Sequence, residues 1–325
     1  MPDLNVGGQA VIEGVMMRSV DRVATAVRKP NGEILVKTDP YKSITTRYKV
    51  LGWPIVRGAV SFVEMLLIGI KTLNFSADIA IREIEAEEAL KKGKEVKARD
   101  PKKGNVAMMV STFFAFAFGI ALFFFFPLAL ADLFGIKKDA MAFNLLAGGI
   151  RLTMFLLYVW LISFFKDFKR IFQYHGAEHK SIYAFEMGDD LTPERAACHT
   201  RFHPRCGTSF ILIVALSAIL IYAVADSIFA LIAGYPPALA ERFILHFSLL
   251  PIVAGGSYEL LKLSGRTREN KVTRVLIRPG LWLQKITTKE PSMDQLEVAI
   301  VALEAALGRT GSEIASTPVA VTQES

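Results

Sequence analysis

Cysteine and histidine are scarce in this 325-residue chain, which has two of the first and five of the second. Two cysteines are too few for the multiple disulfides of a small secreted scaffold. The N-terminus, which reads MPDLNVGGQ, has neither a basic n-region nor an apolar h-region, so we expect no cleaved signal peptide. No internal repeat is visible. The chain is therefore not a disulfide-stapled domain, and a transporter built from inverted repeats is disfavoured.

Apolar residues are instead abundant and are gathered into blocks. Residues 106–131 contain no charged side chain over 26 positions, which exceeds the roughly 20 needed to cross a bilayer. Three further blocks are comparably long, at 142–165, 208–233 and 243–263. A secreted soluble enzyme and a simple nucleic-acid-binding domain are excluded by this pattern. The sequence predicts a mainly α, polytopic membrane protein with four transmembrane helices.

Basic residues flank these blocks unevenly. Lysine and arginine crowd before the first block, between the second and third, and after the fourth, whereas the other two connections hold only Lys137, Lys138 and Arg242. Because positive residues mark the cytoplasmic side, we expect a cell-membrane protein with both termini and the 166–207 connection in the cytoplasm. The net charge of +7 then concerns orientation and anionic lipid rather than any specific nucleic acid.

The first 54 residues look like a small cytoplasmic β-meander. Strand-like stretches occur at 10–17, 23–28 and 34–36, and Asn31-Gly32 between apolar runs is a strong hairpin signal. This N-terminal region precedes the four-span domain and is expected to lie against it.

The stretch 55–80 is apolar enough to enter a membrane but contains Arg57, Glu64 and Lys71. Spanning would place the basic residues of 1–54 outside, so we interpret it as an amphipathic or re-entrant helix at the cytoplasmic interface, with a fifth span as the alternative. The other expected regions are a charged helix or linker at 81–105, the membrane domain at 106–263, a cytoplasmic region with an amphipathic helix at 264–310, and a disordered tail at 311–325.

Four of the five histidines and both cysteines lie between positions 175 and 206. In HGAEHK, His175 and His179 are four residues apart, so on a helix they share a face and could hold one Zn²⁺. Glu178 lies beside them and could accept a proton from a metal-activated water. The order H-x-x-E-H is that of the inverzincin proteases. The alternative is a surface helix whose His and Glu pair with neighbours such as Lys180 and Glu186.

Further ligands are available for such a site. His203 and Cys206 precede the third span, and Glu259 lies near the cytoplasmic end of the fourth. Cys206 could instead form a disulfide with Cys198 or be a buried small residue, and Glu259 could form a salt bridge to Lys262 or to an N-terminal arginine.

A second set of residues is also marked as candidates. Glu13 lies between glycines that indicate close backbone approach, and His199 repeats the four-residue spacing with His203. Arg151 and Asp226 lie within spans, where we expect them to snorkel or to pair with each other.

Five blocks resemble the YqhQ-like family of uncharacterised bacterial membrane proteins. They are GGQAVIEGVMMR at 7–18, HGAEHK at 175–180, HPRCGTSF at 203–210, SYELLK at 257–262 and TTKEP at 287–291. The family is described as predicted metal-dependent enzymes. The resemblance therefore implies a site containing Glu13, His175, Glu178, His179, His203, Cys206 and Glu259.

Two hypotheses of different class follow. The first is a membrane metalloenzyme, hydrolytic and acting on a membrane-embedded or lipid-linked substrate, with zinc or another divalent transition metal and Glu178 as general base. The second is a non-catalytic scaffold whose cytoplasmic face docks a protein complex, a ribosome or anionic lipid, with at most a structural metal.

Overall fold

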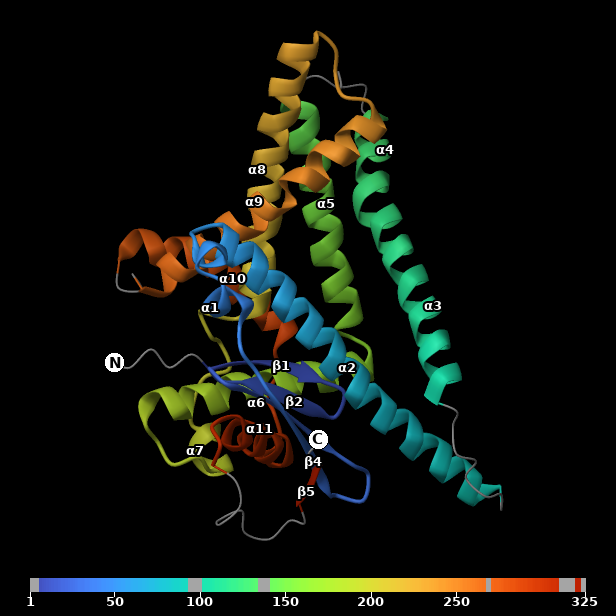
Figure 1. The fold of residues 1–325 in the computed structure, drawn as a ribbon, viewed down its shortest axis with the longest axis vertical. Helices are drawn as coiled ribbons and strands as arrows, with labels where there is room; N and C mark the ends of the chain where they lie inside the picture. Colours follow the sequence, from blue (N-terminus) through green and yellow to red (C-terminus); the bar gives the residue numbers. More distant parts are fainter. Residues whose placement is uncertain (1–5, 93–100, 134–140, 267–269, 310–318, 323–325) are drawn as a thin grey trace.

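An antiparallel meander opens the chain (Figure 1). The computed structural model describes residues 6–92, 101–133, 141–266, 270–309 and 319–322. Each of the first four strands pairs with the next, as expected for a meander; they are β1 (Gly7–Val11), β2 (Gly14–Arg18), β3 (Arg22–Arg28) and β4 (Ile34–Pro40). The expected strand at 10–17 is broken by a two-residue turn at Ile12-Glu13, where Glu13 has a positive φ of 52°.

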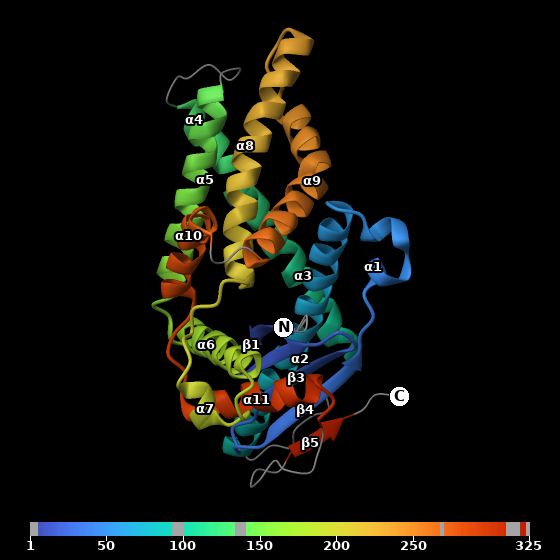
Figure 2. The same cartoon turned by 90° about the vertical axis from the view of Figure 1, so that its left-hand side faces the viewer.

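Helices cover both faces of this sheet (Figures 1 and 2). Alternate strand residues point to opposite faces, so Val15 and Met17 pack under α6 (Lys166–Met187) and α11 (Met293–Ala306). On the other face, Val11 and Met16 pack against α2 (Val56–Lys91). The sheet domain is thus built from segments that lie before, between and after the membrane helices.

Four described helices are long and apolar enough to cross a membrane, as the sequence predicts, and the chain is a multi-pass membrane protein. They cover Val110–Asp132, Met141–Ile162, Gly207–Ala233 and Leu239–Leu263. The corresponding elements are α3 (Pro101–Ile120) with η2 (Ala121–Phe125) and α4 (Phe126–Asp132), then α5 (Met141–Ile162), α8 (Gly207–Ala233) and α9 (Leu239–Arg266). Because α6, α11 and the strands pack together, both terminal regions and the 166–207 connection lie on one side of these spans.

The first span is interrupted by a π-helical turn. Pro127 has no N–H to donate to the carbonyl of Phe123, so regular α-helical bonding cannot pass this point. The chain adopts a π-helix at η2 and resumes as α4. The irregularity at Pro127 thus takes the form of a π-turn just before the proline.

The segment at 55–80 forms the first part of α2, which continues as one helix to Lys91. It is not among the four candidate spans. Ile68, Phe75 and Ile79 face the sheet, whereas its N-terminal end packs on α9, where a Cβ on Gly58 would lie 2.9 Å from Cα of Gly255. Residues 93–100 of the expected charged segment lie outside the described residues.

The C-terminal region holds two helices, α10 (Lys271–Thr287) and α11. Ser292 is the N-cap residue of α11 and forms a capping box. The disorder expected throughout 311–325 is wrong for β5 (Val319–Thr322), which pairs in parallel with β4. Its Val-Ala-Val-Thr sequence suits a strand, and β4 offers an unpaired edge. The rest of that expected tail lies outside the described residues. The short elements are α1 (Ile44–Arg47), η1 (Lys49–Gly52) and α7 (Pro193–Ala197).

Candidate metal centre

Two histidines and one cysteine meet where the sheet domain joins the membrane helices. His175 and His179 lie one turn apart on α6, and Cys206 is the N-cap residue of α8. One ligand atom from each of these three side chains lies within 4.8 Å of the other two. In the described part of the chain, this His–His–Cys cluster is the one group of three or more such side chains close enough to share a metal ion.

Backbone carbonyls determine how the two imidazoles point. Nδ1 of His175 lies 2.8 Å from the carbonyl oxygen of Thr287, and Nδ1 of His179 lies 2.6 Å from that of Arg201. A carbonyl can only accept, so each Nδ1 donates its proton and each neutral ring keeps its lone pair on Nε2. Nε2 of His175 contacts Sγ of Cys206 at 3.2 Å. Nε2 of His179 is buried and has no hydrogen-bond partner among the described residues.

Burial controls the charge of this cluster. It holds the pKa of His179 below its usual value, so that this ring is neutral. Burial alone would raise the pKa of the Cys206 thiol, but His179 and the hydroxyl and N–H of Thr208 bring it below the usual value. The neutral imidazole of His179, the ring of His175 and a readily ionised thiol form a donor set that suits Zn²⁺.

Glu178 is buried beside the cluster, with only 5% of its surface exposed. The N–H of Gly8 in β1 donates to its carboxylate, and the charges of His175 and Cys206 act on it. Burial raises the pKa of Glu178 to about 8, which places its proton exchange near neutral pH. Gly8 permits this approach, since a Cβ there would lie 2.9 Å from Cγ of Glu178 and 2.7 Å from the Met16 carbonyl oxygen.

His203 is buried next to the cluster but is not one of its three members. Its ring centroid lies 5.6 Å from that of His179. Its Nδ1 accepts the N–H of Arg205, and its Nε2 lies 3.4 Å from a carboxylate oxygen of Glu186. Glu186 also forms an ion pair with Arg205. His203 and Glu186 therefore hold the loop that carries Cys206 against α6.

Two other candidates lie in separate ion pairs. His199 contacts Asp189, with Nε2 and Oδ2 2.7 Å apart. Glu13 binds the guanidinium of Arg170 through both carboxylate oxygens and accepts a hydrogen bond from Tyr174. The glycine-flanked strand around Glu13 does approach α6 closely, but through Gly8. No disulfide links the cysteines, because both are free, Cys198 exposed and Cys206 buried.

Glu259, which the sequence offered as a further metal ligand, lies in an ion pair instead. The guanidinium of Arg57 in α2 binds it in a bidentate pair, with Nε to Oε1 at 2.7 Å and Nη2 to Oε2 at 2.5 Å. Both carboxylate oxygens are therefore engaged by an N-terminal arginine, which was the alternative to metal binding.

Arg151 and Asp226 do not pair with each other. Asp226 is held by Arg242 and His246 at 2.9 Å each, all three buried between α8 and α9. Arg151 donates instead from Nε to the carbonyl oxygen of Phe123 at 2.7 Å. It lies in the membrane domain, separate from the His–His–Cys cluster.

Several groups that hold the site could not be recognised from the sequence. The carbonyls of Thr287 and Arg201 orient the histidines, and the Gly8 N–H holds Glu178. Gln284, at the end of α10, binds the backbone of His203 through both its amide oxygen and its amide nitrogen. The TTKEP block at 287–291 did indicate one of these groups, because it begins with Thr287, whose carbonyl contacts His175.

Comparison with known proteins places this chain among proteins of unknown function. The model of a family described as "Protein of unknown function (DUF1385)" matches residues 53–309. An uncharacterised protein of Bacillus subtilis (strain 168), YqhQ, is 34% identical over 298 residues, covering 90% of this chain and 89% of the relative. No solved structure matches the chain.

Proposed function

The chain belongs to the DUF1385 family, and from its His–His–Cys cluster we propose that it is a membrane-embedded, metal-dependent hydrolase. The observation that carries this proposal is the pair of carbonyl-held imidazoles, both of which turn an Nε2 lone pair toward the Cys206 sulfur. A histidine that ligates a metal usually donates its other ring N–H to a carbonyl or carboxylate in this way.

The donor set fits a zinc ion. Zn²⁺ favours imidazole nitrogen and thiolate sulfur, and three protein ligands leave one position for water or substrate, as in catalytic sites. The buried Nε2 of His179, which has no hydrogen-bond partner in the described structure, also fits, since a metal would satisfy it. When bound, zinc would supply a Lewis acid and lower the pKa of water.

The chain's own residues would do the rest. The Gly8 N–H holds the carboxylate of Glu178 beside the cluster, where it would accept a proton from the attacking water. The Thr287 and Arg201 carbonyls would keep the histidines in their ligating orientation. The cluster lies at the start of α8, so the substrate we propose is membrane-embedded or lipid-linked. We place this side of the protein in the cytoplasm from the flanking basic residues.

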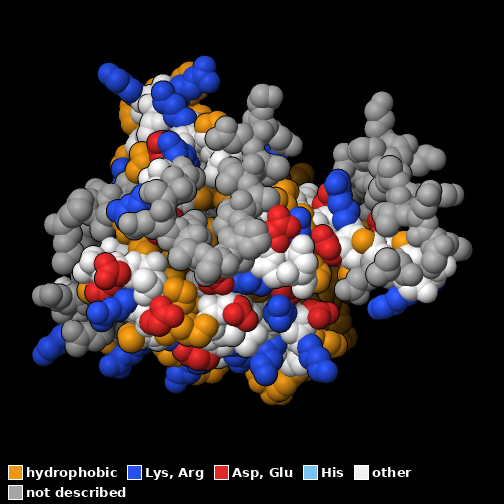
Figure 3. Space-filling model, turned by 90° about the horizontal axis from the view of Figure 1, so that it is seen from below, with side chains coloured by type: hydrophobic (Ala, Val, Ile, Leu, Met, Phe, Trp, Pro, Cys, Tyr) orange, Lys and Arg blue, Asp and Glu red, His pale blue; other side chains and the backbone are white. Residues whose placement is uncertain are grey.

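A non-catalytic scaffold with a structural metal is the second candidate, and burial is the observation that favours it. His179 is 1% exposed and Cys206 4% exposed, and closed sites are typical of structural zinc. The end of the sheet domain opposite the spans carries acidic and basic side chains interspersed (Figure 3), so its described surface is not a uniformly basic docking face.

Metal analysis of the purified full chain tests the shared premise. We expect about one equivalent of zinc in the wild type and in His199→Ala, and a loss of the metal in His179→Ala. His199 is the matched control because it lies in the same connection between α5 and α8 but pairs with Asp189. Less than about half an equivalent in the wild type would remove the basis of both candidates.

Glu178→Gln separates the two candidates. The variant should retain zinc, because Glu178 is not a member of the cluster. A hydrolase would then accumulate an uncleaved lipid or membrane-protein substrate in cells carrying this variant, detectable by mass spectrometry against wild-type cells. Identical lipid and membrane-protein profiles in the two strains would favour the scaffold.

A further inference from the structure

Arg151 is a cation in the middle of a membrane span. It lies ten residues after Met141 and eleven before Ile162, the two ends of α5. At 1.5 Å per residue, this is about 15 Å from either end of the helix, close to the centre of a hydrocarbon core about 30 Å thick. Ionisable groups at this depth are costly and usually mark a functional contact.

Its contacts within the chain use only part of the guanidinium. Nε donates to the Phe123 carbonyl, the group that Pro127 leaves without its helical partner. The guanidinium carbon lies 5.5 Å from the Phe124 ring centre. Neither Nη atom has a hydrogen bond or an ion pair within the described residues. The contact at the π-turn therefore accounts for one donor of Arg151, and no carboxylate among the described residues pairs with its positive charge.

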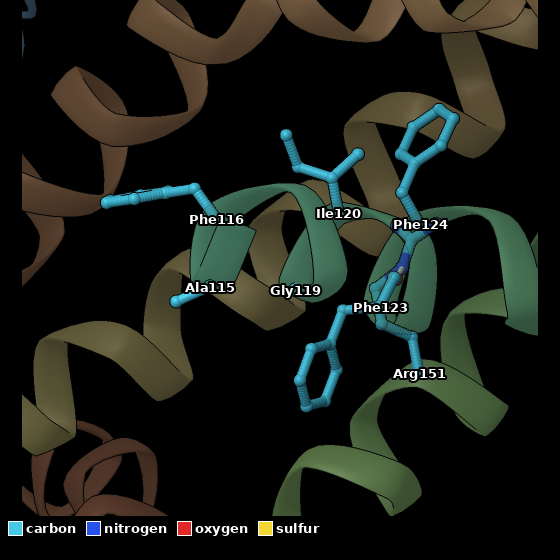
Figure 4. Close-up of a pocket in the computed structure, with 7 residues that line it drawn as sticks. All are labelled: Ala115, Phe116, Gly119, Ile120, Phe123, Phe124 and Arg151. Atoms are coloured by element: carbon cyan, nitrogen blue, oxygen red, sulfur yellow. Dashed lines mark hydrogen bonds between the residues drawn. The ribbon is translucent and has the colours of Figure 1, made fainter. Parts of the chain in front are cut away.

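A hollow lies beside this charge, lined by residues of the first span and by Arg151 of α5 (Figure 4). Its volume is about 500 Å³, and Arg151 is the one ionisable side chain among the residues that line it. Ala115 and Gly119 form part of the wall, one turn apart, and a Cβ on Gly119 would meet nothing within 4 Å. Small residues at this spacing let another helix approach closely in a membrane.

The neighbouring surface of α3 is also uncovered. Phe113, Phe116 and Phe118 are 68%, 56% and 68% exposed, and α3 stands at the edge of the helix group (Figures 1 and 2). Exposed apolar residues alone would be satisfied by lipid. The small-residue step together with a cation that has no carboxylate partner among the described residues instead favours an occupant with a carboxylate at mid-membrane depth.

We propose that this hollow binds a transmembrane helix of a partner protein that carries an aspartate or glutamate near its middle. A phospholipid cannot supply the anion, since its phosphate lies at the membrane surface, about 15 Å away and farther than a side chain snorkels. A second copy of this chain does not fit either. The acids described within its own spans are engaged, Asp226 by Arg242 and Glu259 by Arg57, or lie near a membrane end, as do Asp132 and Glu241.

A synthetic helix tests this inference. The probe is a leucine–alanine transmembrane peptide of about 22 residues with one central aspartate, and its control has alanine there. The full chain, with a donor fluorophore on exposed Cys198, is reconstituted into phosphatidylcholine vesicles, and energy transfer to acceptor-labelled peptide is titrated. We expect the aspartate peptide to bind about tenfold more tightly than the alanine peptide.

Two variants locate the binding. Arg151→Met should abolish the preference for aspartate, and Gly119→Leu should weaken binding of both peptides while leaving Arg151 and its bond to Phe123 in place. The second variant keeps the test decisive if the first perturbs the π-turn. An unchanged thermal unfolding midpoint in detergent reports that each variant remains folded. Equal binding of the two peptides to the wild type would refute the proposal. So would a preference that persists in Arg151→Met, or one that follows added phosphatidylglycerol instead of the aspartate.

Discussion

Gly176 lets α6 pack closely against the segment whose Thr287 carbonyl orients His175, and its replacement by alanine is the sharpest test of that contact. A Cβ at position 176 would lie 2.1 Å from the carbonyl oxygen of Lys289. Ordinary contact begins at 3.4 Å, so the two segments must separate by about 1.3 Å. The bond between His175 Nδ1 and the Thr287 carbonyl, now 2.8 Å, spans the same gap and would lengthen beyond hydrogen-bonding distance.

The expected effects of Gly176→Ala are of two kinds. Overpacking against a backbone atom costs about 1–3 kcal/mol, offset in part by the better helix propensity of alanine. Loss of the carbonyl that orients a ligand reduces metal affinity by about 10–100-fold. Competition with a zinc chelator measures the affinity, and thermal unfolding in detergent measures the stability.

Gly149→Ala provides the matched control, because a Cβ at Gly149, also within a helix, would meet nothing within 4 Å. It should leave zinc affinity unchanged and stability equal or slightly higher. If Gly176→Ala binds zinc as tightly as Gly149→Ala, the carbonyl frame does not govern the site and this reasoning is refuted.

Three further outcomes are expected. The metal-free protein should lose up to about 5 kcal/mol of stability as the pH rises from 4.5 to about 8, because Glu178 keeps a proton in the folded state that the unfolded chain releases. Thermal unfolding measures this pH dependence, and Glu178→Gln should remove it. Asp226→Asn should cost about 3–5 kcal/mol in the same assay by leaving Arg242 buried without its counter-ion, far more than Glu241→Gln. A membrane-impermeant maleimide should label Cys198 in inside-out vesicles but not in intact cells, and the reverse pattern would contradict a cytoplasmic sheet domain.

The architecture was largely readable from the sequence because its strongest signals are local. Long apolar runs mark the spans, and the turn at Asn31-Gly32 marks a hairpin independently of the rest of the chain. The four-residue spacing of His175 and His179 likewise needs only the helix that contains them.

The features that the sequence could not predict depend on contacts between residues that are distant in sequence. Arg57 and Glu259 are 202 positions apart, so no local pattern distinguishes their ion pair from a free ligand. β5 joins the sheet only because β4 has an open edge. The atoms that orient the histidines belong to peptide groups, which every residue possesses and which composition therefore cannot single out.

The interleaving of the sheet domain with the spans constrains how the protein is made. α11, which covers one face of the sheet, begins at Met293, 265 residues after β3 ends at Arg28. At about 5–20 residues per second, the ribosome needs roughly 10 to 50 s to bridge that interval. During this time all four spans are synthesised, and Val15 and Met17 remain without the part of their cover that α11 provides. All four spans are therefore synthesised before the domain at the membrane surface can close.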